Sequence, residues 1–145
     1  LVGAEKHDEG ARLSALAVEL GVAPRVHFRG AVLEAELPGL YARCAAVVIP
    51  SRLEGFGIGV LEAQRAGAPL AIANAGALPE TAGAGVPHFL PDDVAGCAQA
   101  VRAALSLSRE TLAEHAQRAE CFRWADSARA LALAWTDVAR LAPAR

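Results

Sequence analysis

Two carboxylates, Glu54 and Glu62, flank a run of alternating glycines at positions 55, 57 and 59. Glycine has no Cβ, so a ligand can approach the main-chain N–H groups of such a run closely. If a helix begins here, its first N–H groups and the positive end of its dipole favour a phosphate. A carboxylate in the early turns of that helix, such as Glu62, can accept hydrogen bonds from two adjacent sugar hydroxyls.

Glu54 precedes the glycines, so its side chain can reach the far side of the same phosphate. Two carboxylates on either side of a phosphate cradle fit a ligand that carries a sugar at each end. A nucleotide diphosphate sugar is such a ligand. Glycines before a helix, or two glutamates on a surface, are each common alone, and it is their joint placement after an apolar strand that indicates a binding site.

The elements that would position these residues can be predicted from the flanking sequence. Residues 45–49 are short, apolar and β-branched, which predicts a strand buried on both faces and ended by Pro50. A helix is expected over about 57–66, closed by Gly67, and the next strand over 69–73. In parallel sheets ligands bind beyond the carboxyl ends of the strands, and residues 51–59 occupy that position.

In the rest of the chain, segments with the residue spacing of a strand alternate with segments that have the spacing of a helix. Period-two spacing predicts a strand over 25–29, and helical spacing predicts a helix over 8–20. Further predictions are the end of a strand at 1–3, a strand at 86–90, and helices at about 34–44, 79–81, 93–107, 109–119 and 124–141. This alternation indicates an α/β fold with a doubly wound, mostly parallel sheet.

Composition excludes several classes of function. The chain has 145 residues, a net charge of −2, 54% hydrophobic residues and 5% aromatic residues. This length suits one domain with a small-residue core, and the charge gives no electrostatic footprint for nucleic acid. No apolar run approaches the roughly 18 residues of a membrane span. Cys44, Cys97 and Cys121 lack metal-site or disulfide spacing, which favours buried reduced thiols in a cytoplasmic protein.

Several other side chains are expected to have structural roles. The pair Asp92 and Asp93 predicts a helix cap, and Ser51 has no partner at the spacing of a nucleophilic triad. Packing or surface positions are expected for His27 and His115, and Trp124 and Trp135 are expected to anchor the last helix by packing.

Residues 50–63 resemble the glutamate–seven residues–glutamate motif of retaining glycosyltransferases with the GT-B fold. The similarity continues in order along nearly the whole chain. It is carried by residues 26–30, 40–45, 66–69, 76–80 and the run Phe122-Arg-Trp124. The resemblance implies that residues 1–145 form the Rossmann-like, nucleotide-sugar-binding domain of the carboxy-terminal half of such an enzyme.

The resemblance also implies a role for each residue of the site. Glu54, as the catalytic residue, would hold hydroxyls of the donor sugar, and Glu62 would bind the ribose. Contacts to the sugar and the diphosphate would come from Gly55, Phe56, Gly57, Ile58, Gly59 and Val60, and contacts to the base from the loop that ends at Val32. The donor is the substrate, and neither a cofactor nor a metal ion is implied, because side-chain cations balance the diphosphate.

The chain departs from the family pattern at those cations. In the family an arginine and a lysine grip the diphosphate from a segment that would precede Leu1, while Lys6 comes too late and Arg52 is expected at the surface or rim. The first strand and the acceptor-binding amino-terminal domain are also missing, and the chain contains no methionine. We therefore expect a piece of a longer protein that transfers no sugar at a useful rate alone. Its open sheet favours marginal stability or self-association.

The sequence leaves three functions to be distinguished. The first is donor binding in a retaining hexosyltransferase, and the second is a non-catalytic nucleotide-sugar-binding or interaction module. The third, a nicotinamide-binding oxidoreductase domain, requires an acidic residue about 20 positions after the glycines. Asn74 stands there instead, and Glu80 comes too late.

Overall fold

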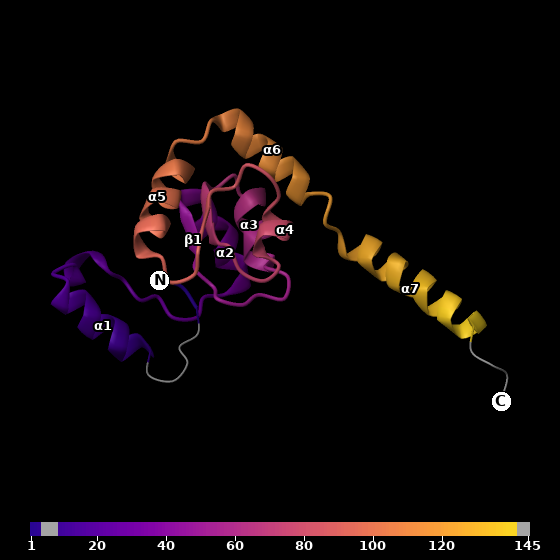
Figure 1. The fold of residues 1–145 in the computed structure, drawn as a ribbon, viewed down its shortest axis with the longest axis horizontal. Coiled ribbons are helices and arrows are strands. Elements are labelled where there is room, and N and C mark those ends of the chain that lie inside the picture. The colour runs from indigo at the N-terminus through magenta and orange to yellow at the C-terminus, as the bar shows by residue number, and fades with distance from the viewer. Residues whose placement is uncertain (4–8, 142–145) are drawn as a thin grey trace. The chain divides into compact units, whose positions relative to one another are not determined.

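The computed structural model describes residues 1–3 and 9–141, and it divides into two compact units, Leu1–Leu40 and Tyr41–Arg145 (Figure 1). We call them the first and the second unit. The helix α2 (Leu37–Arg43) contains the boundary between them.

The first unit contains the helix α1 (Glu9–Glu19) and two short 3₁₀ helices, η1 (Ala23–Arg25) and η2 (Glu34–Glu36). Gly21 follows α1 with a φ of 67°, and its N–H donates to the carbonyl of Val18 at 2.9 Å, which closes the helix. The helix expected over 8–20 is thus confirmed from residue 9 onward, and Asp8 lies outside the described residues.

The strand expected over residues 25–29 is wrong, because Arg25 ends η1 and residues 26–30 form no regular strand. They do pair with the start of the chain. The terminal ammonium of Leu1 donates to His27 O at 2.7 Å, and Arg29 N–H donates to Leu1 O at 2.9 Å. A strand needs a partner of matching length, and here the partner stretch is residues 1–3.

The second unit is built on a parallel sheet with the order β1-β2-β3, comprising β1 (Val47–Ile49), β2 (Leu70–Ala73) and β3 (His88–Phe89). All of β2 is buried, as expected of a central parallel strand. The prediction of burial on both faces is wrong for β1, because Val48 is 39% exposed. The reason is that β1 lies at an edge of the sheet and pairs, within the described part of the chain, on one side alone.

Helices cover both faces of this sheet, with α5 (Val94–Leu105) on one face and α3 (Ile58–Arg65) and α4 (Leu78–Ala82) on the other (Figure 1). The doubly wound arrangement is therefore confirmed. Asp93 caps α5 by accepting from Gly96 N–H at 2.8 Å. The helices α6 (Arg109–Ala119) and α7 (Trp124–Leu141) have the predicted bounds. The core contains mainly alanine, valine, leucine and isoleucine, as the composition predicts.

The packing role expected of the two tryptophans is wrong. Trp124 is 84% exposed and Trp135 is 69% exposed. Side chains 124–140 are all exposed, so α7 buries none of these residues against the described part of the chain. None of the helices in that part of the chain combines the length and the apolar character needed to cross a membrane.

The cysteines are all free, but the expectation of burial holds only in part. Cys44 and Cys97 are half-buried, and burial raises the pKa of both thiols. Cys121 is exposed because it follows the end of α6 on the outside of the molecule.

Candidate glycine-loop and helix site

Gly57 is the N-cap residue of α3, and its position requires a glycine for two reasons. Its φ is 87°, in the left-handed region, and a Cβ there would lie 2.9 Å from Leu78 Cδ2. Gly55, in contrast, faces open space, with nothing within 4 Å of a Cβ. Gly57 therefore turns the chain into the helix, while the backbone at Gly55 is accessible.

The start of α3 has no side-chain cap among the described residues. Val60 N–H donates to Gly57 O at 3.0 Å, so this amide is satisfied within the protein, and the Val60 side chain is fully buried. By helix geometry the N–H groups of Ile58 and Gly59 have no partner inside the helix. These two amides can serve an anion, which is the geometry of phosphate binding at a helix start.

Glu54 is held by the turn that follows β2. Ala77 N–H donates to Glu54 O at 3.0 Å, and Ser51 Oγ donates to Glu54 Oε1 at 3.2 Å. Gly76 lies so close that a Cβ on it would overlap the carbonyl oxygen of Glu54. The backbone of the predicted catalytic residue is thus fixed by a neighbouring strand end, while its carboxylate is half-exposed.

Glu62 lies in the middle of α3 and is also half-exposed. Tyr41, from α2, donates its hydroxyl to Glu62 Oε2 at 3.1 Å. Burial and, next, the negative charge of Glu62 raise the pKa of Tyr41 to about 12, so the phenol stays protonated as a donor. Sequence reasoning did not assign a role to Tyr41. Its position in the family-like run of residues 40–45 was the only signal.

A hollow of about 450 Å³ opens beside α3 and contains Glu62. Its walls combine Phe56 and α3 with the segment that joins α6 to α7 and the first turn of α7. The lining residues are Phe56, Ile58, Leu61, Glu62, Arg65, Phe122, Arg123, Trp124 and Ser127. Trp124 was expected to pack, and Phe122 had no assigned role; both line this hollow beside the predicted site.

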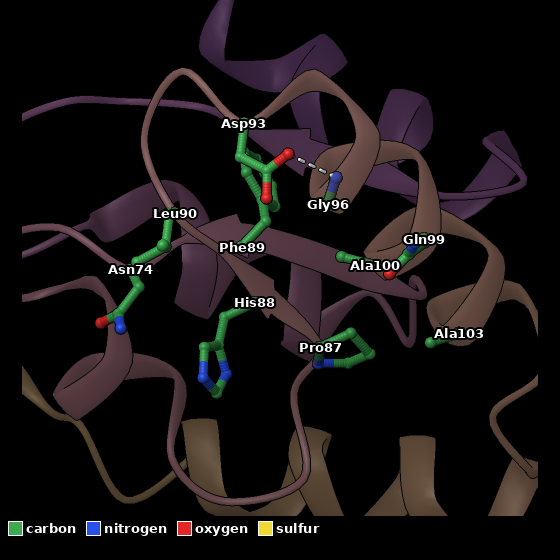
Figure 2. A pocket seen from close by; sticks show the side chains of 10 residues that line it. All are labelled: Asn74, Pro87, His88, Phe89, Leu90, Asp93, Gly96, Gln99, Ala100 and Ala103. Atoms are coloured by element: carbon green, nitrogen blue, oxygen red, sulfur yellow. Dashed lines mark hydrogen bonds between the residues drawn. The ribbon is translucent and has the colours of Figure 1, made fainter.

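A second hollow, of about 500 Å³, lies along β3 and α5 (Figure 2). Asn74 and His88 lie at one side of it, while Asp93 lies at the other with its carboxylate engaged by Gly96 N–H (Figure 2). Their polar atoms do not converge on one point. Neither Glu54 nor Glu62 lines this hollow, so it is not the site that the glycine run forms.

Arg52 lies at the surface, as expected, and pairs with Asp92. Its Nη2 is 2.6 Å from Asp92 Oδ1, and the two side chains are 77% and 67% exposed. The pair joins the loop after β1 to the turn before α5. Of the two aspartates predicted as a cap, Asp93 therefore caps the helix, and Asp92 serves this ion pair at a φ of 67°.

The remaining predicted residues belong to the first unit or have packing roles. Val32 is half-buried in the first unit, whereas residues 54–62 all belong to the second. His115 is buried on α6, as expected of a structural histidine, and burial lowers the pKa of its imidazole. Across the described residues, no three His, Cys, Asp or Glu side chains gather in the manner of a metal site.

Comparison with known proteins identifies the family. Residues 1–106 match the model of the family "Glycosyl transferases group 1". A D-inositol 3-phosphate glycosyltransferase of Streptomyces avermitilis is 36% identical over 129 residues, covering 86% of this chain and 28% of that protein. One from Corynebacterium kroppenstedtii is 35% identical over 136 residues, covering 88% of this chain and 30% of its own length. The chain thus spans less than a third of these relatives.

Solved structures show the same fold. Sucrose-phosphate synthase from Thermosynechococcus elongatus superposes with a TM-score of 0.81 at 24% identity, over 98% of this chain and 38% of that one. HepE from Anabaena, solved in complex with UDP, gives a TM-score of 0.77 at 28% identity, over 94% of this chain and 40% of that one. These superpositions confirm the fold class implied by the resemblance. The chain belongs to the group 1 glycosyl transferases.

Proposed function

We propose that the second unit binds the nucleotide diphosphate sugar that donates the glycosyl group in a retaining transfer reaction. The observation that carries this proposal is the uncapped start of α3, with Glu54 before it and Glu62 within it. Two amides there can hold an anion, and the two half-exposed carboxylates can accept hydroxyl donors. The UDP bound to HepE, a structure of the same fold, supports a nucleotide as the ligand.

Each part of the donor then has a partner in this site. The N–H groups of Ile58 and Gly59 hold the diphosphate, and Glu62 accepts from the ribose hydroxyls while Tyr41 donates to its Oε2. Glu54 accepts from hydroxyls of the donor sugar, helped by the amides of Phe56 and Gly57. Val32, in the first unit, remains the expected contact for the base.

The same groups would assist the chemical step. When the bond between sugar and diphosphate breaks, negative charge grows on the departing diphosphate, and the start of α3 is fixed in place to stabilise it. The acceptor hydroxyl attacks from the face that the diphosphate leaves and gives its proton to an oxygen of the departing diphosphate, which retains the configuration at the anomeric carbon. We expect no metal ion to be required, with the balancing cations supplied by side chains outside residues 54–62.

We further propose that this chain acts as the donor-binding part of a longer cytoplasmic hexosyltransferase, whose acceptor-binding domain lies outside residues 1–145. The share of the relatives that the chain spans supports this proposal. Residues 1–145 alone are then expected to bind the donor and transfer little sugar. An oxidoreductase role has no support, because Asn74, and not an acidic residue, follows β2.

Calorimetric titration of residues 1–145 with UDP-, GDP- and ADP-glucose tests the proposal. Loss of a hydrogen bond to a charged group costs about 1.5–3 kcal/mol, so Glu62→Gln should weaken binding of the preferred donor roughly 10- to 150-fold. Glu110→Gln, at an exposed position on α6, is the matched control and should bind as the wild type does. Equal affinities in Glu62→Gln and wild type would refute the ribose role. Absence of binding to every nucleotide sugar would refute donor binding by this unit.

A further inference from the structure

Arg118, in the last turn of α6, reaches the carbonyl end of α4. Its Nη2 donates to Glu80 O at 2.9 Å, and its Nη1 donates to Thr81 O. The last carbonyls of a helix have no partner within the helix, and a guanidinium can satisfy two of them at once. Arg118 therefore fixes the end of α4 from a helix that lies far away in the sequence.

Thr81 passes this restraint on to the loop before α3. Thr81 is 3% exposed, and its hydroxyl donates to the carbonyl oxygen of Phe56. Phe56 is the middle of the loop between Glu54 and Gly57, so the restraint ends on the backbone that presents the predicted sugar-binding amides. One route thus runs from Arg118 through Thr81 to Phe56.

A second route joins the same two ends through aromatic rings. The Arg118 guanidinium lies 5.1 Å from the centre of the Phe122 ring. The rings of Phe122 and Phe56 are 5.9 Å apart at 68°, an edge-to-face contact. Such cation–π and aromatic contacts are directional, so they orient the Phe56 side chain as Thr81 orients its carbonyl.

Two neighbouring residues support the position of Arg118 and of its contact Phe122: Gly83 and Arg65. A Cβ on Gly83, whose φ is 78°, would overlap Arg118 Nε and lie 2.7 Å from its Cζ, so glycine provides the space. Arg65, at the end of α3, donates to Phe122 O at 2.7 Å and to Ala119 O at 3.1 Å. Phe122 is therefore held by one arginine at its ring and by another at its carbonyl.

We propose that Arg118 is a positioning residue for donor binding, which acts through Thr81 and Phe122 to hold Phe56 and the loop of residues 54–57 in the binding conformation. The inference rests on the proposed function of that loop. Arg118 and Phe122 lie outside residues 1–106, the part that matches the family model. The segment after α5 thus contributes to the site by supporting the loop of residues 54–57.

The first test needs no ligand and measures hydrogen exchange of individual amides by NMR in residues 1–145. Arg118→Lys keeps the charge but loses the fork that bridges two carbonyls, and Phe122→Leu removes the ring. Both should speed exchange several-fold at the N–H groups of Ala77 and Val60, which donate to Glu54 O and Gly57 O at the two ends of the loop, and leave the amides of β2 unchanged. Arg109→Lys, on the exposed start of the same helix, should change neither. Unchanged exchange at Ala77 and Val60 in both variants, or an equal rise across β2, would overturn the proposal.

The second test compares a nucleotide sugar with the nucleoside diphosphate alone. Losing about one hydrogen bond of support should lower the affinity of Arg118→Lys for the preferred sugar nucleotide about 3- to 10-fold. The affinity for the nucleoside diphosphate should fall less, because Ile58, Gly59 and Glu62 remain in place. Equal losses for both ligands would contradict positioning of the sugar-binding loop. A wild type that binds neither ligand would refute the proposed function, while the exchange experiment still decides the role of Arg118.

A double-variant cycle adds a check on the two routes. If Arg118 and Phe122 act on Phe56 together, Arg118→Lys combined with Phe122→Leu should weaken sugar-nucleotide binding by less than the product of the single effects. If the effects multiply fully, Phe122 does not transmit the influence of Arg118, and the proposed aromatic route is wrong.

Discussion

The backbone of Gly76 lies against the backbone of Glu54, and the space between them does not admit a side chain. A Cβ on Gly76 would overlap Glu54 O and lie 2.9 Å from Glu54 N. The turn after β2 thereby places the predicted catalytic residue without contacting its carboxylate. Substitutions at glycine 76 consequently test how the position of Glu54 depends on its neighbour.

Gly76→Ala should destabilise the protein more than Gly67→Ala. Both glycines have positive φ, 53° and 69°, so each alanine carries the left-handed strain of about 1–2 kcal/mol. Gly67 has open space around its Cα, whereas overpacking at Gly76 adds about 1–3 kcal/mol. Urea unfolding measures the difference, and donor titration should show weaker binding for Gly76→Ala only. Equal stability of the two variants would show that the Glu54 backbone moves aside freely.

Tyr41 is the single tyrosine of the chain, so the ultraviolet absorbance of phenolate reports on it alone. The folded protein should titrate with a pKa of about 12, well above the ordinary 10.0, because of burial and then the charge of Glu62. Glu62→Gln should lower this pKa, and urea-unfolded protein should titrate near 10. A folded protein that already titrates near 10 would contradict the contact between Tyr41 and Glu62.

The same shift gives a stability prediction with a definite sign. A group whose pKa is raised by folding contributes stability that is complete below its unfolded pKa and is lost as the pH rises through its folded pKa. The contribution of Tyr41 should therefore disappear between pH 10 and about 12. Tyr41→Phe should remove this part of the pH dependence, and unfolding curves for the two proteins across that range provide the comparison.

His115 should affect the stability of the folded protein at acidic pH. Its pKa is lowered from the ordinary 6.5, mainly by burial, with Arg118 also lowering it and the Ala84 backbone and Glu114 acting in the opposite direction. A histidine with a depressed pKa contributes stability above its unfolded pKa, and this stability is lost as the pH falls through its folded pKa. Stability should thus fall below pH 6.5, and less steeply in His115→Gln. Urea unfolding of the two proteins above and below pH 6.5 measures the difference.

Gln64 is 1% exposed, and its amide donates to Ala82 O at 2.8 Å. Its Oε1 is buried without a partner among the described residues. Gln64→Leu removes both the bond and this unsatisfied oxygen, so stability should change by less than about 1 kcal/mol. Gln64→Glu buries a charge next to a carbonyl and should cost about 3 kcal/mol or more at neutral pH. Gln117→Glu, at an exposed position, is the control, and equal stabilities of the two glutamate variants would contradict the burial of Gln64.

Local signals allowed the helices to be predicted from the sequence. The bounds of α6 and α7 follow from helical spacing and from residues at the helix ends, and both kinds of signal lie within the element itself. The strand at 25–29 failed because a strand also depends on its partner. Trp124 and Trp135 were misassigned for a related reason, since an apolar stripe identifies a helix but not the surface that covers it.

The candidate site likewise contains residues that a local pattern predicts and residues that no local pattern predicts. The helix start at Gly57 could be predicted because glycine spacing is a local property of the chain. Tyr41 and Glu62 meet across 21 residues, and Arg118 and Thr81 meet across 37. No motif spacing marks such pairs, so a single sequence gives no means of pairing them. The residues that support the loop were therefore found only in the structure.

The loop between Glu54 and α3 is fixed at both of its ends and in its middle. Ala77 holds the carbonyl of Glu54, Thr81 holds that of Phe56, and the helix starts at Ile58. An insertion or deletion of one residue would leave at least one of these attachments unmade and would turn Glu54 away from its present direction relative to Glu62. The length of this segment should consequently tolerate as little change as the glycine at position 57.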